Sequence, residues 1–369
     1  MTGEMSESLA GWCWTAIENV AEARRLFKIA ETLGHRRRRK RYGLLGDVQA
    51  PLAAIRFREH CHNTRCACHV AALWDGVRGF SRDARTGSLH SMARPFASMI
   101  GLGDFGSYAD YMREASRLSD GNDRREAARA RKRGYTTRRI GQNSHNVSLR
   151  DIVGSKWRRS GGIVAASREA SLARSDDANQ TIVPFTKPAC NEHWRIDFGV
   201  FNKSAPERMM GKATLGRSGN LIEIVFFMGH GAALRDGVMK LLMFDMMQWL
   251  LDSGDPLAAG AEFLMYGAVE EGAAGRDKWR RRLGFHPFAL DAPSPPERDW
   301  RPEGWNPAVY LALNPDLRAA GAMPLAHFRL NGVFEERPYR PGKPGRSRLA
   351  QIVGSGALDD LGGVPATDF

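Results

Sequence analysis

Residues 221–288 constrain the fold more than any other part of the chain, because two strand-like runs alternate there with two helix-like runs. LIEIVFFMGHG is β-branched and aromatic and ends in glycines, and ALRDGVMKLLMFDMMQWLLDSGD is long, apolar on one face and closed by Asp-Ser-Gly. AEFLMYGAV is a second strand, and GRDKWRRRLGFHPF is a basic helix. The pattern predicts an α/β unit whose first helix begins at a glycine turn.

A glycine turn between a strand and a helix has a specific physical property. It exposes backbone N–H groups beside the positive end of the helix dipole, where a pyrophosphate binds. The residues expected to bind a cofactor phosphate in this way are Gly229, Gly231, Arg235, Gly237 and Val238. This turn is the strongest candidate for a binding site in the chain.

The order of elements resembles the C-terminal half of the GNAT superfamily of N-acyltransferases. In that family the turn carries Gln or Arg, two residues, Gly, one residue, then Gly or Ala, and it grips the coenzyme A pyrophosphate. The nearest match here is RDGVM at 235–239, which is one residue short and lacks the second small residue. A helix ending in Leu-Gly-Phe follows the fifth strand, and the position that often holds a general-acid tyrosine is Arg280. The resemblance covers residues 190–290 and implies acyl-CoA as cosubstrate and an amine as acceptor.

Two further strands precede this block. HWRIDFGVFN alternates in polarity, and MMGKATLGRSGNLIEIVFF reads as a hairpin that turns at residues 217–220. Together with the resemblance, the predicted fold class is α/β (α+β): a GNAT-like mixed, mostly antiparallel sheet flanked by helices, with helical N- and C-terminal extensions.

N-acyl transfer requires a base for the amine, donors for the thioester carbonyl and a proton for the leaving thiolate. Glu223, inside the strand LIEIVFF, is the first candidate base, acting directly or through water. His230 and Asp197 are the other candidates, and Tyr266 is the phenol closest to the position of the family's acid. An outward-facing strand residue or a loop histidine is the alternative interpretation of each.

The net charge of +13 is concentrated in two segments. Residues 36–41 (RRRRKR) contribute +6, and residues 121–160 carry twelve basic and three acidic residues, or +9. A local basic surface favours an anionic partner such as a phosphate, a nucleic acid or an acidic lipid. A solvated helix with a basic linker explains the same pattern.

The helix REAARARKR, which ends before Gly134-Tyr135, is similar to the Arg-Lys-Ala helix of Fem-type peptidoglycan aminoacyl transferases. Those enzymes contain two GNAT-like units, so the similarity implies a degenerate first unit in residues 86–180 and a possible tRNA partner. The basic residues that would face phosphates are Arg129, Arg131, Lys132, Arg133, Arg158 and Arg159.

Three cysteines and three histidines lie within one ten-residue window, HCHNTRCACH at 60–69. Thiolate and imidazole are ligands that zinc prefers, and His60, Cys61, Cys66, Cys68 and His69 are the candidate ligands. However, no Cys-x-x-Cys pair occurs, and no second ligand pair lies at the distance typical of a zinc ribbon or finger. We therefore assign no metal ligands and favour buried thiols in a reducing compartment.

The remaining segments complete the predicted domain organisation. Residues 1–85 are an N-terminal extension, 291–304 a proline-rich linker, and 342–369 a disordered tail. Residues 305–341 resemble a short helical module at the ends of bacterial glycan-synthesis glycosyltransferases. Its aromatic residues favour a small core over a sugar platform: Trp305, Tyr310, His327 and Phe328.

The sequence contains no run approaching the roughly 18 apolar residues of a membrane helix, and its first thirty residues lack the pattern of a signal peptide. We expect a cytoplasmic protein of bacterial type. The predicted function is GNAT-like N-acyl transfer from acyl-CoA. The alternatives are a catalytically inactive GNAT-like binding domain, an aminoacyl-tRNA-dependent Fem-type transferase and a basic nucleic-acid-binding protein.

Overall fold

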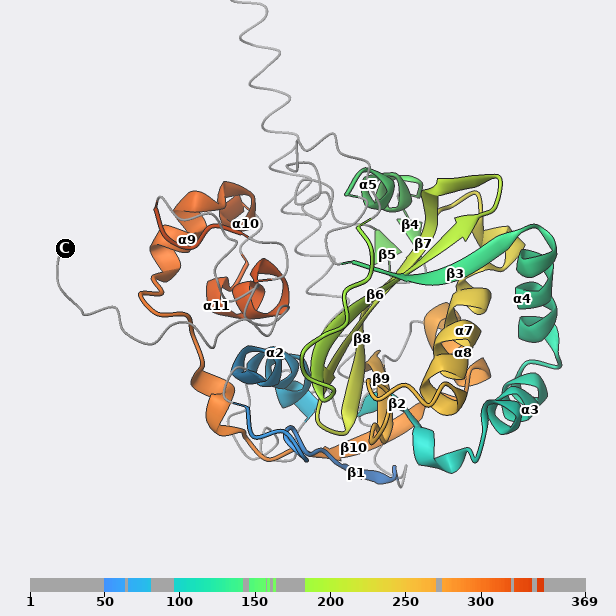
Figure 1. Ribbon diagram of the computed structural model, residues 1–369, viewed down its shortest axis with the longest axis horizontal. Helices are drawn as coiled ribbons and strands as arrows, with labels where there is room; N and C mark the ends of the chain where they lie inside the picture. Colours follow the sequence, from blue (N-terminus) through green and yellow to red (C-terminus); the bar gives the residue numbers. More distant parts are fainter. Residues whose placement is uncertain are drawn as a thin grey trace, which may run out of the picture. The chain divides into compact units, whose positions relative to one another are not determined.

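The computed structural model describes residues 50–63, 66–80, 96–141, 146–156, 158–159, 162–163, 183–269, 274–319, 322–333 and 337–341 (Figure 1). Several predicted features lie outside these residues: the arginine run at 36–41, most of the predicted N-terminal extension and the tail at 342–369.

An eight-stranded sheet is the centre of the described structure. Its strand order is β1-β10-β2-β9-β8-β7-β6-β3. The strands are β1 (Leu52–Ala54), β2 (Ala97–Gly101), β3 (Tyr135–Ile140), β6 (His193–Asn202), β7 (Ala205–Ser218), β8 (Leu221–Gly229), β9 (Phe263–Ala268) and β10 (His286–Asp291). Only the pairs β1/β10 and β8/β9 are parallel. The prediction of a mixed, mostly antiparallel sheet flanked by helices is confirmed.

Helices cover both faces of this sheet (Figure 1). On one face α7 (Val238–Asp252) packs against the sheet, with α3 (Tyr108–Leu118), α4 (Asn122–Lys132) and α8 (Ala274–Arg282) around it. On the other face α2 (Ala67–Val77) contacts β6 and β7, and α5 (Asn146–Gly154) contacts β7 and β8. The larger core lies under α7, because that helix is apolar on most of its circumference and buries eight of its residues.

The described residues also include several short elements. They are the 3₁₀ turns η3 (Arg78–Phe80), η5 (Leu102–Asp104), η6 (Leu234–Asp236) and η7 (Pro296–Asp299), and the small ribbon β4 (Arg158–Arg159) with β5 (Gly162–Ile163). The strands β2 and β3, from the region predicted to be a separate first unit, belong to the same sheet as β6 to β10.

The hairpin between β7 and β8 turns at Gly219 and Asn220, within the predicted residues 217–220. Gly219 has a φ of 60°, and a Cβ there would overlap the backbone of Arg56. The Asn220 side chain accepts from the Arg56 N–H at 2.9 Å and donates to the Ala54 carbonyl. The turn therefore fixes the segment that follows β1 against the end of the hairpin.

The C-terminal helices are α9 (Pro307–Leu313), α10 (Pro315–Ala319), α11 (Pro324–His327) and the π turn η8 (Phe328–Gly332). Tyr310, Phe328 and Tyr339 are buried together, with the Trp305 ring 4.9 Å from the rings of Tyr310 and Phe328. Cys68 of α2 is part of the same cluster. These aromatic side chains thus form a small core that packs on α2.

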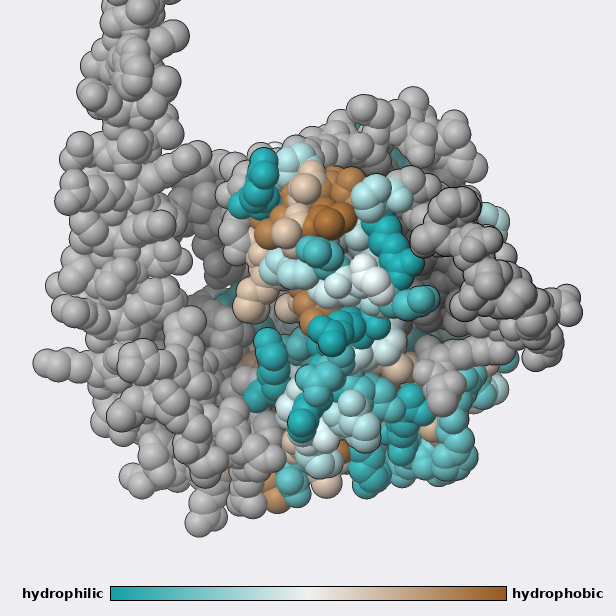
Figure 2. All heavy atoms as spheres, turned by 90° about the vertical axis from the view of Figure 1, so that its left-hand side faces the viewer, coloured by the Kyte–Doolittle hydropathy of each residue, from teal (hydrophilic) through white to brown (hydrophobic). Residues whose placement is uncertain are grey.

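The side of the molecule that carries α9, α10 and α11 is mostly hydrophilic over the described residues, with one hydrophobic patch (Figure 2). Met323 is an exposed large apolar residue of this module. Among the described helices, none is long and apolar enough to cross a bilayer.

Candidate active site at the parallel strands

Strands β8 and β9 separate after a short parallel ladder. The ladder pairs Leu221 with Phe263, Ile222 with Leu264 and Glu223 with Met265. β8 continues for six residues beyond Glu223, and in this part it pairs with β7 and no longer with β9. A bulge displaces the register between Thr214 and Leu215, which bends β8 at this point. The two strands therefore form a wedge with its apex at Glu223.

Aromatic side chains line the wedge on the face covered by α7 and α8. The ring centroids of Phe227 on β8 and Tyr266 on β9 are 5.7 Å apart, and Trp279 of α8 lies 5.4 Å from Phe227 and 6.0 Å from Tyr266. All three residues are only partly buried. The partly accessible surface of the wedge on this face is therefore made of aromatic rings that contact one another.

Arg280 occupies the position at which the GNAT resemblance places a tyrosine. Its guanidinium donates to the Ala268 carbonyl at the end of β9 and lies 4.7 Å from the Tyr266 ring centroid. The Tyr266 ring also contacts the rings of Phe285 and Trp279.

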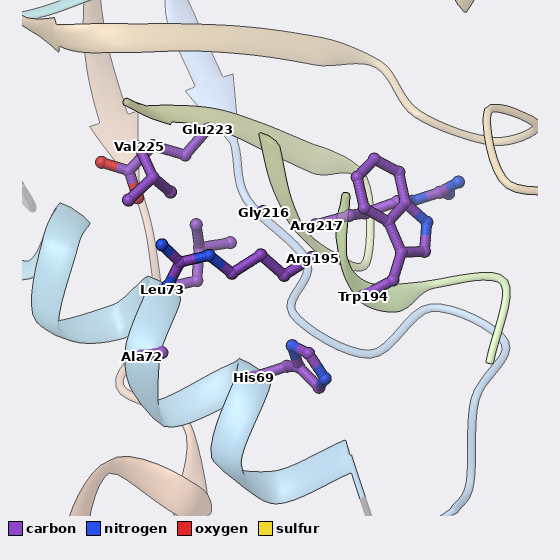
Figure 3. A pocket seen from close by; sticks show the side chains of 9 residues that line it. All are labelled: His69, Ala72, Leu73, Trp194, Arg195, Gly216, Arg217, Glu223 and Val225. Carbon is purple, nitrogen blue, oxygen red and sulfur yellow. The ribbon is translucent and has the colours of Figure 1, made fainter. Parts of the chain in front are cut away.

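The Glu223 side chain projects to the opposite face, toward α2. There it borders a cavity of about 30 Å³, which has room for a water or two. Figure 3 shows the lining side chains: Glu223 and Val225 from β8, Trp194 and Arg195 from β6, Arg217 from β7 beside Gly216, and His69, Ala72 and Leu73 from α2.

The environment of Glu223 changes its protonation. Its carboxyl group lies so close to α2 that a Cβ on Gly76 would be 2.8 Å from Oε2. Burial raises the pKa of the Glu223 carboxyl to about 7, and the positive charge of Arg195 offsets part of that rise. Burial lowers the pKa of His69 to about 3, so this second group at the cavity is neutral at physiological pH. Glu223 is therefore poised to exchange a proton near neutral pH.

The turn after β8 differs from an open phosphate-binding turn, because seven of its backbone N–H groups donate within the protein. The N–H groups of residues 230–234, 236 and 237 all donate to protein acceptors. Gly231 donates to Ser155 Oγ of the segment after α5 at 2.8 Å, and Ala232 donates to Nδ1 of His230. His230 thereby accepts a hydrogen bond from its own turn.

Side chains and backbone from α4 and β3 cover the same turn. Asp236 forms an ion pair with Arg133 and accepts from the Tyr135 hydroxyl at 3.1 Å. Gly237, with a φ of 90°, packs so closely on the Glu126 carbonyl that a Cβ would overlap it. Val238 is fully buried and Arg235 is exposed. Of the predicted phosphate contacts, Arg235 is thus the one whose side chain faces solvent.

Asp197, another candidate base, lies in a closed polar cluster between β6 and β7. Lys212 Nζ is 2.7 Å from Asp197 Oδ2, and Thr214 donates to Oδ1 at 2.6 Å. All three residues are buried. This arrangement directs both carboxylate oxygens of Asp197 to protein donors.

The predicted residues therefore fall into separate places. Glu223 and Tyr266 both lie at the apex of the wedge, on opposite faces of the sheet. His230 and the glycines are at the far end of β8, about 20 Å from Glu223 at the usual rise of a strand. Arg195 was missed by sequence analysis, because its role depends on β6 lying two strands away from β8.

The basic helix α4 is partly neutralised by the acidic residues of its neighbours. Arg131 pairs with Asp245 of α7, and Arg133 pairs with Asp236 of η6. Arg129 and Lys132 are exposed, and the side chains of Arg158 and Arg159 lie outside the described residues.

The cysteines and histidines at 60–69 lie in different surroundings in the structure. Cys68 is buried against the C-terminal module, and His69 borders the Glu223 cavity. Cys61 and Cys66 instead meet Cys190 and His193. The second ligand pair is not at the spacing of a zinc ribbon or finger, because it lies 129 positions from Cys61 and folding alone brings it close.

No protein-family model and no curated protein matches the chain. Among solved structures it is similar to a tandem GNAT protein from the clavulanic acid biosynthesis pathway (13% identity, 52% of this chain and 50% of that chain, TM-score 0.31). It is similar to FemX (11% identity, 53% and 60%, TM-score 0.35) and to a GCN5-related N-acetyltransferase from Kribbella flavida (16% identity, 42% and 47%, TM-score 0.25). The chain spans about half the length of these proteins.

Proposed function

We propose that this chain is an N-acyltransferase that binds the thioester arm of an acyl donor in the wedge between β8 and β9. The observation that carries the proposal is the end of the parallel ladder at Glu223, where the strands separate beside partly exposed aromatic rings. Phe227, Tyr266 and Trp279 supply the apolar surface for the arm on one face of the sheet, and Glu223 supplies a carboxylate on the opposite face of the apex.

The proposed chemistry assigns Glu223 as the base that takes a proton from the acceptor amine. Because burial raises its pKa to about 7, the carboxyl can both accept and release a proton near neutral pH. The adjoining cavity is large enough for a water that would relay the proton to a more distant amine. Tyr266, on the other side of the apex, is the proposed donor of a proton to the leaving thiolate.

The closed turn after β8 favours a second candidate, a GNAT-like domain that binds no coenzyme. A pyrophosphate would have to compete with Ser155 for the Gly231 N–H and with the negative charge of Asp236. For this reason the proposed transferase would recognise its donor mainly through the pantetheine arm and the acyl group.

A thermal-denaturation screen with two donor series separates these candidates. One series contains acyl-CoAs of increasing chain length, and the other contains the matching acyl-pantetheines, which lack the pyrophosphate. We expect both series to raise the melting temperature, because a ligand at a hundredfold excess over its Kd stabilises the fold by about 2.7 kcal/mol. Stabilisation by neither series would reject the transferase and support the non-catalytic domain.

Activity is then measured with the donor that stabilises best and a panel of primary amines. We expect Glu223→Gln to retain the thermal shift and to lower the transfer rate by about 10²- to 10⁴-fold, the usual contribution of a general base. Glu207→Gln, on the exposed part of β7, is the matched control and should leave the rate unchanged.

A further inference from the structure

Four side chains with soft or borderline ligand atoms converge beside the start of β6. Cys61 and Cys66 come from the segment that leads into α2, Cys190 precedes β6, and His193 is the first residue of β6. Their three Sγ atoms and the His193 ring nitrogen all lie within 4.8 Å of one another. We propose that these four residues bind one structural zinc ion.

The distances between the ligand atoms fit a mononuclear tetrahedral site. Cys61 Sγ is 3.4 Å from Cys66 Sγ and 3.5 Å from Cys190 Sγ, and Cys190 Sγ is 3.4 Å from Nδ1 of His193. Zn–S bonds of about 2.3 Å in a tetrahedron separate the sulfurs by ~3.8 Å. A disulfide would bring two sulfurs to about 2.05 Å, and a two-iron cluster would distribute its four ligands over two metal ions.

The His193 ring is oriented for metal binding by its second nitrogen. Nε2 is 2.8 Å from the Phe57 carbonyl, which can only accept a hydrogen bond, so the proton is on Nε2. Nδ1 consequently directs its lone pair toward Cys190. A histidine that donates its other N–H to a backbone carbonyl is the usual arrangement of zinc-binding histidines. The Phe57 carbonyl also accepts from Ser218 Oγ at 2.9 Å, which fixes its position.

Backbone contacts hold the two ligand pairs in place. The Glu192 carboxylate accepts from the N–H groups of His60 and Cys61 at distances between 2.9 and 3.1 Å. The Gly219 N–H donates to the Glu192 carbonyl at 3.1 Å. Glu192, between Cys190 and His193, therefore ties the Cys61 loop directly to the second ligand pair.

The donor set determines the metal and its role. Three thiolates and one imidazole suit zinc, and four protein ligands close the coordination sphere, which is typical of a structural site. Cys66 directly precedes α2, and α2 carries Gly76 against Glu223. The zinc would thus join α2 to the β6–β7 end of the sheet and set the position of the helix over the candidate base.

Metal content and cobalt spectroscopy of the full-length protein test this proposal. We expect protein purified anaerobically to contain about one zinc per chain by plasma mass spectrometry. Replacement of zinc by Co²⁺ should give the intense visible bands of tetrahedral cobalt and a sulfur-to-cobalt charge-transfer band. Cys190→Ser and His193→Ala should each weaken Co²⁺ affinity more than the about 10- to 100-fold cost of losing only a supporting hydrogen bond.

Matched controls use neighbouring residues outside the cluster. Cys68→Ala removes a buried thiol that packs on the C-terminal module, and His62→Ala removes an exposed imidazole. Both should keep the zinc and the cobalt spectrum. Because a ligand variant can lose its fold, the spectrum of the unmodified chain is decisive by itself: octahedral or absent cobalt bands would overturn the proposal. Stoichiometric iron in place of zinc, or a disulfide at Cys61 in the anaerobic protein, would overturn it as well.

Discussion

Glu223→Gln should stabilise the fold at alkaline pH while it slows transfer. The ordinary pKa of this carboxyl is 4.5, and burial raises it to about 7 in the folded protein. The folded chain therefore binds more protons than the unfolded chain between these values, and its stability falls as pH rises from 4.5 to 7. Above that window the full cost of holding a charged carboxylate in the cavity is present. Glutamine has nearly the same shape and no charge.

The size of the effect follows from the pKa difference. At 1.36 kcal/mol per pKa unit the cost approaches about 3 kcal/mol, and the partial exposure of Glu223 reduces it to about 1–2 kcal/mol. We expect Glu223→Gln to increase the free energy of unfolding by that amount near pH 8 and by only a few tenths of a kcal/mol near pH 4.5.

Urea denaturation of both proteins at several pH values between about 4.5 and 8 measures this difference. Titrations elsewhere in the chain cancel, because they are common to both proteins. Glu207→Gln removes one exposed carboxylate of the same type and controls for net charge. A gain that does not vary with pH, or a loss of stability at pH 8, would show that the carboxyl is not held in an environment that disfavours its charge.

Three further predictions concern single residues. Gly76→Ala should shift the Glu223 carboxyl, because the added Cβ would lie 2.8 Å from Oε2. We expect the transfer rate to fall at least about tenfold, while the free energy of unfolding changes by less than about 1 kcal/mol. Gly154→Ala is the control in both assays, because a Cβ there would have nothing within 4 Å. Gly237→Ala should lower the free energy of unfolding in urea by about 3 kcal/mol or more, because the added Cβ overlaps the Glu126 backbone and alanine is strained at a positive φ. Gly254→Ala also has a positive φ but open space around the Cβ, so it should cost only about 1–2 kcal/mol. Arg217→Met should cost about 2–5 kcal/mol in the same assay, because it leaves the carbonyls of Gly219 and Ala259 without their buried donor and removes one of the two donors to the Leu257 carbonyl. A cost below about 1 kcal/mol would contradict this account.

Local patterns were sufficient to predict the main strands and the β7–β8 turn. The alternating polarity of HWRIDFGVFN and the β-branched run at 221–227 reflect which face of each strand is buried. Residues that are close in the sequence largely determine this pattern, so both strands could be predicted from it. Insertion of β2 between β9 and β10 could not be predicted, because the pairing of Met99 with Met265 and His286 joins segments that are distant in the sequence.

Predictions about the candidate site had the same limit, because the availability of a single amide or ligand atom depends on distant segments. The glycines at 229–237 indicate a turn with accessible amides, but whether those amides remain available depends on Ser155, Glu126 and Arg133, which belong to other elements. The metal ligands divide in the same way. Cys61 and Cys66 stand out in the sequence, whereas Cys190 and His193 become ligands only because β6 begins beside the loop before α2.

Helix α2 connects the two proposals, because it begins at the cysteine cluster and ends at Glu223. Cys66 precedes its first turn and Gly76 is in its last, so a displacement at one end moves the other. If zinc fixes that helix, removal of the metal should lower the pKa of Glu223 toward its ordinary value, because a loosened α2 admits water to the carboxyl. The pH dependence of the Glu223→Gln stability difference would then shrink in chelated protein. An undiminished pH dependence in metal-free protein would show that the sheet alone, and not the metal-anchored helix, sets the environment of the base.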